Sequence, residues 1–173
     1  SPVKLETETV NTDLMCDGTN LGLMRYNTAG RSTTDSVTLG GGGGVSPAIV
    51  QTAPLSTGIF DNPPTVGNSI VVLVSGESGG DWWDVQSCDI AGATVTDNMG
   101  NVYTKVVASD SHDDGSGNNN SGIWIAPVAN TGAGFAPSVV AKTYTGIDCG
   151  WVISQFLELS GVNSSSPVDV SAA

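Results

Sequence analysis

The hydrophobic positions divide the chain into two parts. From residue 47 onward, short apolar segments rich in β-branched residues recur, each bounded by Gly, Pro, Asn or Asp. The run 70–74, Ile-Val-Val-Leu-Val, is continuously apolar, which is typical of a strand buried on both faces. Residues 1–46 have sparse apolar positions and end close after the glycine run 40–44. We therefore predict an extended N-terminal arm with a Gly-rich linker over 1–46, followed by a β-sandwich domain over 47–173.

The pattern predicts several strands in the second part and no convincing helix. Residues 98–101, Asn-Met-Gly-Asn, form a turn signal with a glycine available for positive φ, so the apolar segments on either side of it are expected to form a hairpin. The segment 150–160 fits either a helical or a strand period, and its flanking glycines and β-branched residues favour the strand. The expected strands are 93–97, 102–108, 122–126, 138–144 and 150–160. Many short strands separated by turn signals predict an all-β, antiparallel sandwich of the immunoglobulin-like or jelly-roll kind.

The N-terminal arm contains one candidate hairpin. Asp17-Gly18 and Ala29-Gly30 are turn signals around a short apolar stretch. A single hairpin buries too little surface to be stable alone, and the glycine run is costly to order. We therefore expect the arm to dock on a neighbouring chain and to be ordered through that contact.

Composition supports the all-β class and excludes some partners. The chain has 173 residues with 23 Gly, 8 Pro and 13% charged residues, and its short polar side chains favour turns and strands over helices. The net charge is −12 and none of the five basic residues is adjacent to another, whereas nucleic-acid binding needs clustered cations. We therefore expect no nucleic-acid ligand and no anionic membrane surface as partner. No apolar run approaches the ~20 residues that span a bilayer.

The three cysteines, Cys16, Cys88 and Cys149, do not have the spacing of a zinc site, and the chain has one histidine. A disulfide between Cys88 and Cys149 is one interpretation, and three isolated buried thiols is the other. No metal and no cofactor is predicted.

The segment 110–120 contains the histidine, His112, among Asp, Ser, Gly and Asn. A catalytic triad needs a rigidly held histidine, and this composition is typical of a solvated hairpin tip. Asp110 and Asp114 alternate with His112 and precede a glycine, which makes them weak calcium candidates, but Ser121 stands where a calcium loop has its bidentate Glu. We predict no catalytic residues and no enzymatic activity.

Trp82 and Trp83 are the most suggestive binding residues. They lie in the segment 79–84, Gly-Gly-Asp-Trp-Trp-Asp. Exposed aromatic side chains on a sandwich loop can stack on sugar rings or fill a protein interface. The alternative is that one or both cover the core of the domain.

Two resemblances to known families add a functional expectation. The segments 64–72, 95–104, 157–162 and 166–169 resemble, in the same order, a family of immunoglobulin-like β-sandwich domains. That family occurs in secreted bacterial proteins and in bacteriophage virion proteins. The segment 16–31, with its Asp-Gly-Thr-Asn and Ala-Gly-Arg motifs, looks like short segments of phage tail and decoration proteins.

The resemblances imply a non-enzymatic structural protein of a phage virion surface, as a capsid decoration (cement) protein or a tail-fibre component. Such a protein would dock by its N-terminal arm on other virion proteins and on copies of itself, in a homotrimer or lattice, and could contact a host-surface glycan. The alternative is a carbohydrate-binding module of a secreted, extracellular bacterial protein. A secreted hydrolase is a third interpretation, but the sequence has no convergent set of acid, base and nucleophile.

Overall fold

The computed structural model describes residues 12–16, 20–26, 32–39, 47–53, 57–77, 88–109, 119–143, 149, 151–163 and 168–172. Within these ranges every regular element is a β-strand. In chain order the strands are β1 (Thr12–Cys16), β2 (Asn20–Tyr26), β3 (Ser32–Leu39), β4 (Ala48–Thr52), β5 (Ser69–Glu77), β6 (Cys88–Asp97), β7 (Thr104–Ser109), β8 (Asn119–Pro127), β9 (Pro137–Thr143), β10 (Trp151–Ser160) and β11 (Val168–Ala172). The predicted all-β, antiparallel sandwich class is confirmed.

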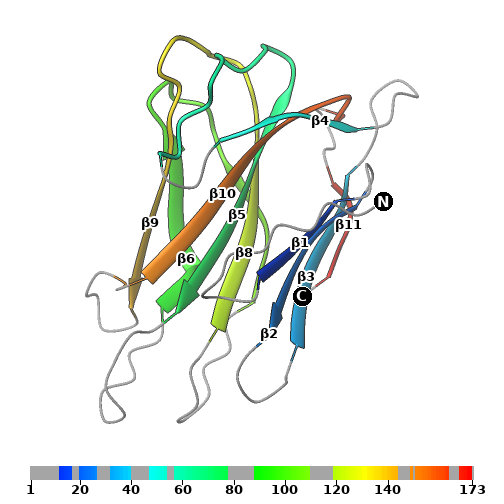
Figure 1. Ribbon diagram of the computed structural model, residues 1–173, viewed down its shortest axis with the longest axis vertical. Helices are drawn as coiled ribbons and strands as arrows, with labels where there is room; N and C mark the ends of the chain where they lie inside the picture. The colour runs from blue at the N-terminus through cyan, green and yellow to red at the C-terminus, as the bar shows by residue number, and fades with distance from the viewer. Residues whose placement is uncertain are drawn as a thin grey trace.

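The strands form three sheets, in which all pairings are antiparallel. A five-stranded sheet has the order β4-β10-β5-β8-β7, a two-stranded sheet pairs β6 with β9, and a four-stranded sheet has the order β1-β2-β3-β11. Figure 1 shows the five-stranded sheet between the other two. β6 contacts β5 and β8 on one side of it, and β3 contacts β7 and β8.

Strand β5 is central because its residues are apolar on both faces. Its residues 70–74 are at most 2% exposed, as the continuous apolar run predicted. Ile70, Val72 and Val74 belong to one core cluster, and Val71 and Leu73 belong to a second. Alternation along the strand therefore sends successive side chains into two separate cores.

The first core lies between the five-stranded sheet and the β6–β9 pair. Trp124 of β8 and Phe156 of β10 are buried in it, and the rings of Phe60 and Phe135 meet at a centroid distance of 5.9 Å. Phe60 lies in the connection between β4 and β5, and Phe135 lies in the connection between β8 and β9. The β6–β9 layer has only two strands, and these loop residues complete it. The Trp124 ring lies over Gly122. A Cβ on Gly122 would stand 2.5 Å from Trp124 Cζ3, so the ring leaves no room for a side chain there.

The hairpin predicted across residues 98–101 is wrong. β6 pairs with β9 and β7 pairs with β8, so the turn crosses from one sheet to the other. The turn signal itself is real, since Gly100 has a φ of 78°. The polar side chains of this turn form hydrogen bonds with the segment 129–136, as described below, and not with a hairpin partner. The predicted strand over 150–160 is confirmed as β10.

The segment 1–46 contributes three strands to the described structure. β1 and β2 are paired across the predicted turn at 17–18, and β3 extends the sheet beyond the predicted turn at 29–30. The last strand, β11, pairs with β3, so the two ends of the chain share one sheet. The glycine run 40–44 lies outside the described residues.

Candidate functional site

One end of the sandwich gathers three connections of the chain. β5, β7 and β9 end there, and β6, β8 and β10 begin there. The strand register brings these strand ends together. In the five-stranded sheet, Glu77 is opposite both Asn119 and Trp151, and Ser109 is opposite Ser121. In the two-stranded sheet, Cys88 is opposite Thr143. We call this the disulfide end, defined by the strand-end residues Glu77, Cys88, Ser109, Asn119, Thr143 and Trp151. The segments 78–87, 110–118 and 144–150 all connect strands at this end.

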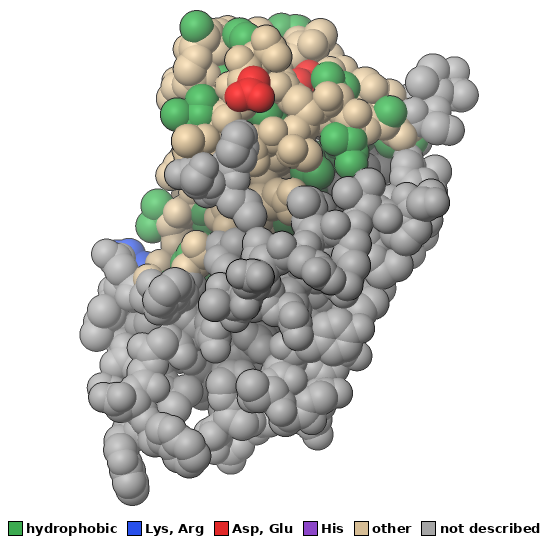
Figure 2. All heavy atoms as spheres, in the orientation of Figure 1, with side chains coloured by type: hydrophobic (Ala, Val, Ile, Leu, Met, Phe, Trp, Pro, Cys, Tyr) green, Lys and Arg blue, Asp and Glu red, His purple; other side chains and the backbone are tan. Residues whose placement is uncertain are grey.

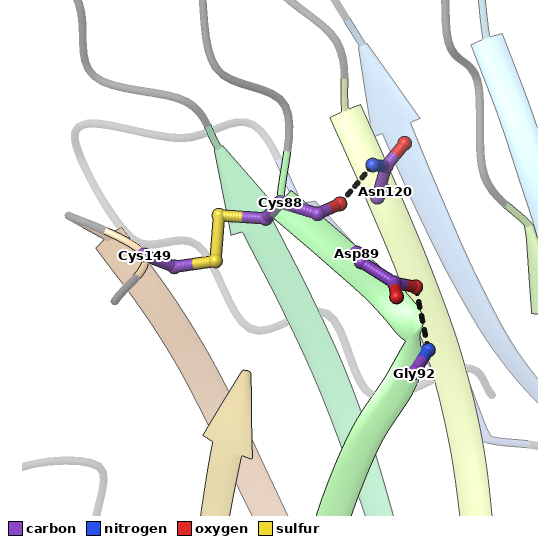
Figure 3. Close-up of a disulfide and its surroundings, with 5 residues drawn as sticks. All are labelled: Cys88, Asp89, Gly92, Asn120 and Cys149. Carbon is purple, nitrogen blue, oxygen red and sulfur yellow. Dashed lines mark hydrogen bonds between the residues drawn. A yellow bond between two sulfur atoms is a disulfide. The ribbon is translucent and has the colours of Figure 1, made fainter. Parts of the chain in front are cut away.

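A disulfide between Cys88 and Cys149 joins two of these connections. The two Cα atoms are 5.7 Å apart, Cys88 is fully buried, and Cys149 packs against the first core. Asn120 of β8 is also buried, and its Nδ2 donates a hydrogen bond to the Cys88 carbonyl (Figure 3). The disulfide and this amide together tie β6, β8 and the chain entering β10. Of the two interpretations of the cysteines, the structure has the bonded pair, while Cys16 lies in β1.

Strand β6 leaves the disulfide end through a bulge. Its pairing with β9 is interrupted between Asp89 and Thr94. The Asp89 Oδ1 accepts a hydrogen bond of 2.6 Å from the Gly92 backbone N–H, as Figure 3 shows, and Lys105 Nζ donates to the Ala91 carbonyl at 2.8 Å. A Cβ on Gly92 would lie 2.2 Å from Asp89 Oδ2, so a side chain there would displace that carboxylate. The bulge is therefore specified by its sequence.

The candidate ligand residues from the sequence lie outside the described residues. Trp82 and Trp83 are in 78–87, and Asp110, His112 and Asp114 are in 110–118.

At the opposite end the chain turns at 63–68, 97–103 and 128–136, and we call it the turn end. Asp97 organises the second of them. Its Oδ1 accepts from the Met99 and Asn101 backbone N–H groups at 2.9 and 3.1 Å. Its Oδ2 accepts from Asn101 Nδ2 at 2.8 Å and from the Tyr103 hydroxyl at 3.0 Å. Burial raises the pKa of Tyr103 above its usual value, and the charge and hydrogen bond of Asp97 raise it further.

Two asparagines extend this network to the turn at 128–136. Asn101 Oδ1 accepts from the backbone N–H groups of Ala129 and Asn130, both at 2.9 Å, and its Nδ2 also donates to the Asn130 carbonyl. Asn98 Nδ2 donates to the Gly134 carbonyl at 2.8 Å, and its Oδ1 accepts from Ala136 at 3.0 Å. These bonds explain why the 97–103 turn crosses between sheets. Sequence reasoning identified the turn but missed its partners, because no local signal specifies them.

Glu158 of β10 is a fully buried carboxylate at the turn end. Its Oε1 accepts from the Thr65 backbone N–H at 2.7 Å and from Asn68 Nδ2 at 2.6 Å, and its Oε2 accepts from Gln51 Nε2 at 2.6 Å. The Gln51 side-chain amide also bonds to the Asn62 backbone. Its Nε2 donates to the Asn62 carbonyl, and its Oε1 accepts from the Asn62 N–H. The carboxylate therefore fixes the 63–68 turn and β4 to β10, and its hydrogen bonds make up for part of the cost of burying it.

The carboxylates at the turn end hold turns and strands in place. Among the described residues, no group of three or more His, Cys, Asp or Glu side chains could hold a metal ion. In the same part of the chain, no helix has the length and hydropathy needed to cross a membrane. Comparison with profiles of known families, with curated proteins and with solved structures finds no match.

Proposed function

We propose that this chain is a non-enzymatic structural protein of a bacteriophage virion, a capsid decoration (cement) protein or a tail-fibre component. The observation that supports this proposal is the disulfide end, where three connections leave a sheet that is buried on both faces. A rigid β-scaffold whose connections gather at one end suits the presentation of a contact surface. The virion itself is inferred from the resemblance of the motifs described above.

The disulfide supports an exposed location. Disulfides persist in oxidising surroundings, such as secreted proteins and the surfaces of virions, and are rare in the cytosol. Cys88 and Cys149 are bonded and lie beside the connections at the disulfide end. A virion surface, or an extracellular location in the alternative function, fits this chemistry.

Docking of the N-terminal segment on the particle is part of the proposal. In the four-stranded sheet, β1 pairs with β2 alone among the described strands. An edge strand with unpaired backbone groups can accept a strand from another protein. We propose that the segment 1–46 contacts other virion proteins or further copies of this chain through this edge, within a trimer or a lattice.

Electron microscopy of purified phage particles labelled with gold-conjugated antibody against this chain tests the proposal. We expect many labels per particle, arranged regularly on the capsid or on the fibres. Particles that contain no copy of the chain by labelling and by mass spectrometry would overturn it.

A carbohydrate-binding module of a secreted bacterial protein is the second candidate function. The adjacent tryptophans Trp82 and Trp83, in a Gly- and Asp-containing segment of the sequence, favour it. Aromatic side chains that stack on sugar rings are common in sugar sites. A glycan array with the unaltered protein and with Trp82→Ala and Trp83→Ala variants tests this function, with Val102→Ala at the turn end as the control. Glycan binding that both tryptophan variants lose, and the control keeps, would favour the module over the virion protein.

A further inference from the structure

The edge strand β4 lies in the five-stranded sheet with little apolar burial. Its side chains are exposed apart from Gln51, which is half-buried. Neither of the two core clusters of described residues contains a residue of β4. Segments with few buried apolar contacts are the first parts of a fold to open, because little apolar surface is exposed when they detach. The position of β4 therefore depends on its backbone pairing with β10 and on the polar side chain of Gln51.

The orientation of the Gln51 side-chain amide is fixed by the Asn62 backbone. The Gln51 Nε2 donates to the Asn62 carbonyl at 3.0 Å, and the Oε1 accepts from the Asn62 N–H at 3.3 Å. Reversal of the amide would place donor against donor and acceptor against acceptor, so Nε2 has to face Glu158 Oε2, to which it donates at 2.6 Å. On the other oxygen of Glu158, the donor from Thr65 is a backbone N–H, which cannot become an acceptor.

Both oxygens of Glu158 thus face a donor that cannot reverse, which suits a carboxylate better than a carboxylic acid. A carboxylate only accepts hydrogen bonds, whereas a carboxylic acid also has to donate its own O–H. The side chain is 0% exposed, so no solvent is in contact with it to accept that O–H. Of the three described donors, only Asn68, whose Nδ2 donates to Oε1 at 2.6 Å, could reverse its amide and accept a proton. Without that reversal, protonation removes a hydrogen bond that holds β4 or the 63–68 turn.

Few other titratable groups lie among the described residues around Glu158. β4 and the 128–136 turn have none, and Glu158 is the only one in β10. In the described connection 57–68 the sole acid is Asp61, which is exposed, and in β5 it is Glu77, at the opposite end of the strand. Figure 2 shows mainly apolar and uncharged polar side chains on the described part of the face in view, with few acids among them. Acidification therefore acts on this part of the sheet mainly through Glu158.

We propose that Glu158 is an acid-sensitive latch: its carboxylate holds β4 to β10, and its protonation releases β4 from the sheet. The latch is closed where Glu158 is ionised and opens as the pH falls through its titration, because the released state binds the proton more readily. The 63–68 turn stays attached, since Gly67 N–H donates to the Val128 carbonyl and Val128 N–H donates to the Asn68 carbonyl. Release frees the backbone groups of β10 that face β4, so acid converts a covered strand into an open edge. The inference goes beyond the proposed function and applies equally to a virion protein and to a secreted module.

Hydrogen exchange of the purified chain, followed by mass spectrometry, tests the latch at pH 7 and at about pH 4, where an ordinary glutamate is roughly half protonated. Rates are expressed relative to an unstructured peptide at the same pH, which removes the pH dependence of the exchange chemistry. We expect the protection of the amides of 48–53, including the Ala53 N–H bonded to the Phe156 carbonyl, to fall at least roughly tenfold in acid. β5 should keep its protection. Equal losses in β4 and β5 would indicate general acid unfolding and would overturn the proposal, as would β4 protection that acid leaves unchanged.

Glu158→Gln gives a second test that does not depend on acid. Its NH2 group cannot accept a hydrogen bond, so in either orientation it faces the Thr65 N–H or the Gln51 Nε2 donor. We expect β4 in this variant to be as weakly protected at pH 7 as β4 of the unaltered chain is in acid. Asp61→Asn removes the exposed acid of the same connection and should behave as the unaltered chain. If β4 of Glu158→Gln still responded to acid, or β4 of Asp61→Asn no longer did, another group would be responsible and the latch would be wrong. Should Glu158→Gln fail to fold, the measurement on the unaltered chain decides alone.

Discussion

The two ends of the sandwich hold their connections by different means. At the turn end, Asp97, Asn98, Asn101 and Glu158 bond to backbone N–H and carbonyl groups of neighbouring turns. At the disulfide end, a covalent bond joins Cys88 to Cys149, and the Asn120 amide bonds to the Cys88 carbonyl.

The two ends differ in the kind of bond that fixes them. At the turn end, a single carboxylate or amide reaches several backbone groups of a turn and satisfies them. At the disulfide end, the covalent bond restricts the unfolded chain, because it closes a loop with a sequence separation of 61 residues. The turn end is therefore specified by side-chain hydrogen bonds, and the disulfide end has a covalent brace.

Removal of the disulfide should have the largest effect and should act on one end. The bond closes a loop with a sequence separation of 61 residues, which corresponds to about 4 kcal/mol of stability in the chain-entropy account. We expect the free energy of unfolding, measured in urea, to be lower by this amount in the Cys88→Ala, Cys149→Ala double variant. Hydrogen exchange should quicken in β6 and β10 near the disulfide and stay slow in the 97–103 turn. Cys16→Ala is the control, and equal loss of protection at both ends would contradict the comparison.

Glu158→Ala should destabilise the turn end next most strongly. The substitution leaves three donors, from Gln51, Thr65 and Asn68, without their buried acceptor. We expect a loss of about 3 kcal/mol in the free energy of unfolding. Gln155→Ala on the same strand is the control and should cost much less. If the two variants unfolded at the same urea concentration, the carboxylate would have no role in holding the turn.

Asp97→Ala should cost about 2 kcal/mol, since the carboxylate is only partly buried and some of its donors can turn to water. The affected donors are the Met99 and Asn101 N–H groups and the Tyr103 hydroxyl. Thermal and urea unfolding measure the loss, and Asp61→Ala, at an exposed aspartate, is the matched control. The prediction fails if the two aspartate variants are equally stable.

The smallest effect is a dependence on alkaline pH. The pKa of Tyr103 is raised in the folded protein by burial and by Asp97, whereas the unfolded tyrosine titrates near 10.0. The contribution of Tyr103 to the free energy of unfolding is thus fully present below pH 10. It declines as the pH rises further, because the tyrosine of the unfolded state releases its proton first. Tyr103→Phe should weaken this decline between pH 10 and 11 in urea unfolding. An identical pH profile for both proteins would show that the hydroxyl is not held as described.

The sequence predicted elements better than it predicted their partners. The run 70–74 predicted a strand buried on both faces, because apolar continuity reports burial directly. The ambiguous segment 150–160 is a strand, as its β-branched content indicated. The hairpin across 98–101 was wrong because a turn signal shows only where the chain bends. Which sheet the next strand joins depends on bonds such as Asn101 to Ala129, and these link residues far apart in the chain.

The candidate site shows the same limit. The sequence singled out Trp82, Trp83, Asp110 and Asp114 by residue type, and these four residues lie outside the described residues. Glu158 was missed because a single acid within an apolar strand gives no sign that Thr65, Asn68 and Gln51 surround it.

The central claim is that this chain acts as one of many copies on a virion surface, and gold labelling of purified phage particles tests it most directly. The account predicts a regular array of labels on the capsid or fibres, with the copy number confirmed by quantitative mass spectrometry. A chain absent from all particles, found instead as a soluble monomer that binds a glycan through Trp82 and Trp83, would contradict it.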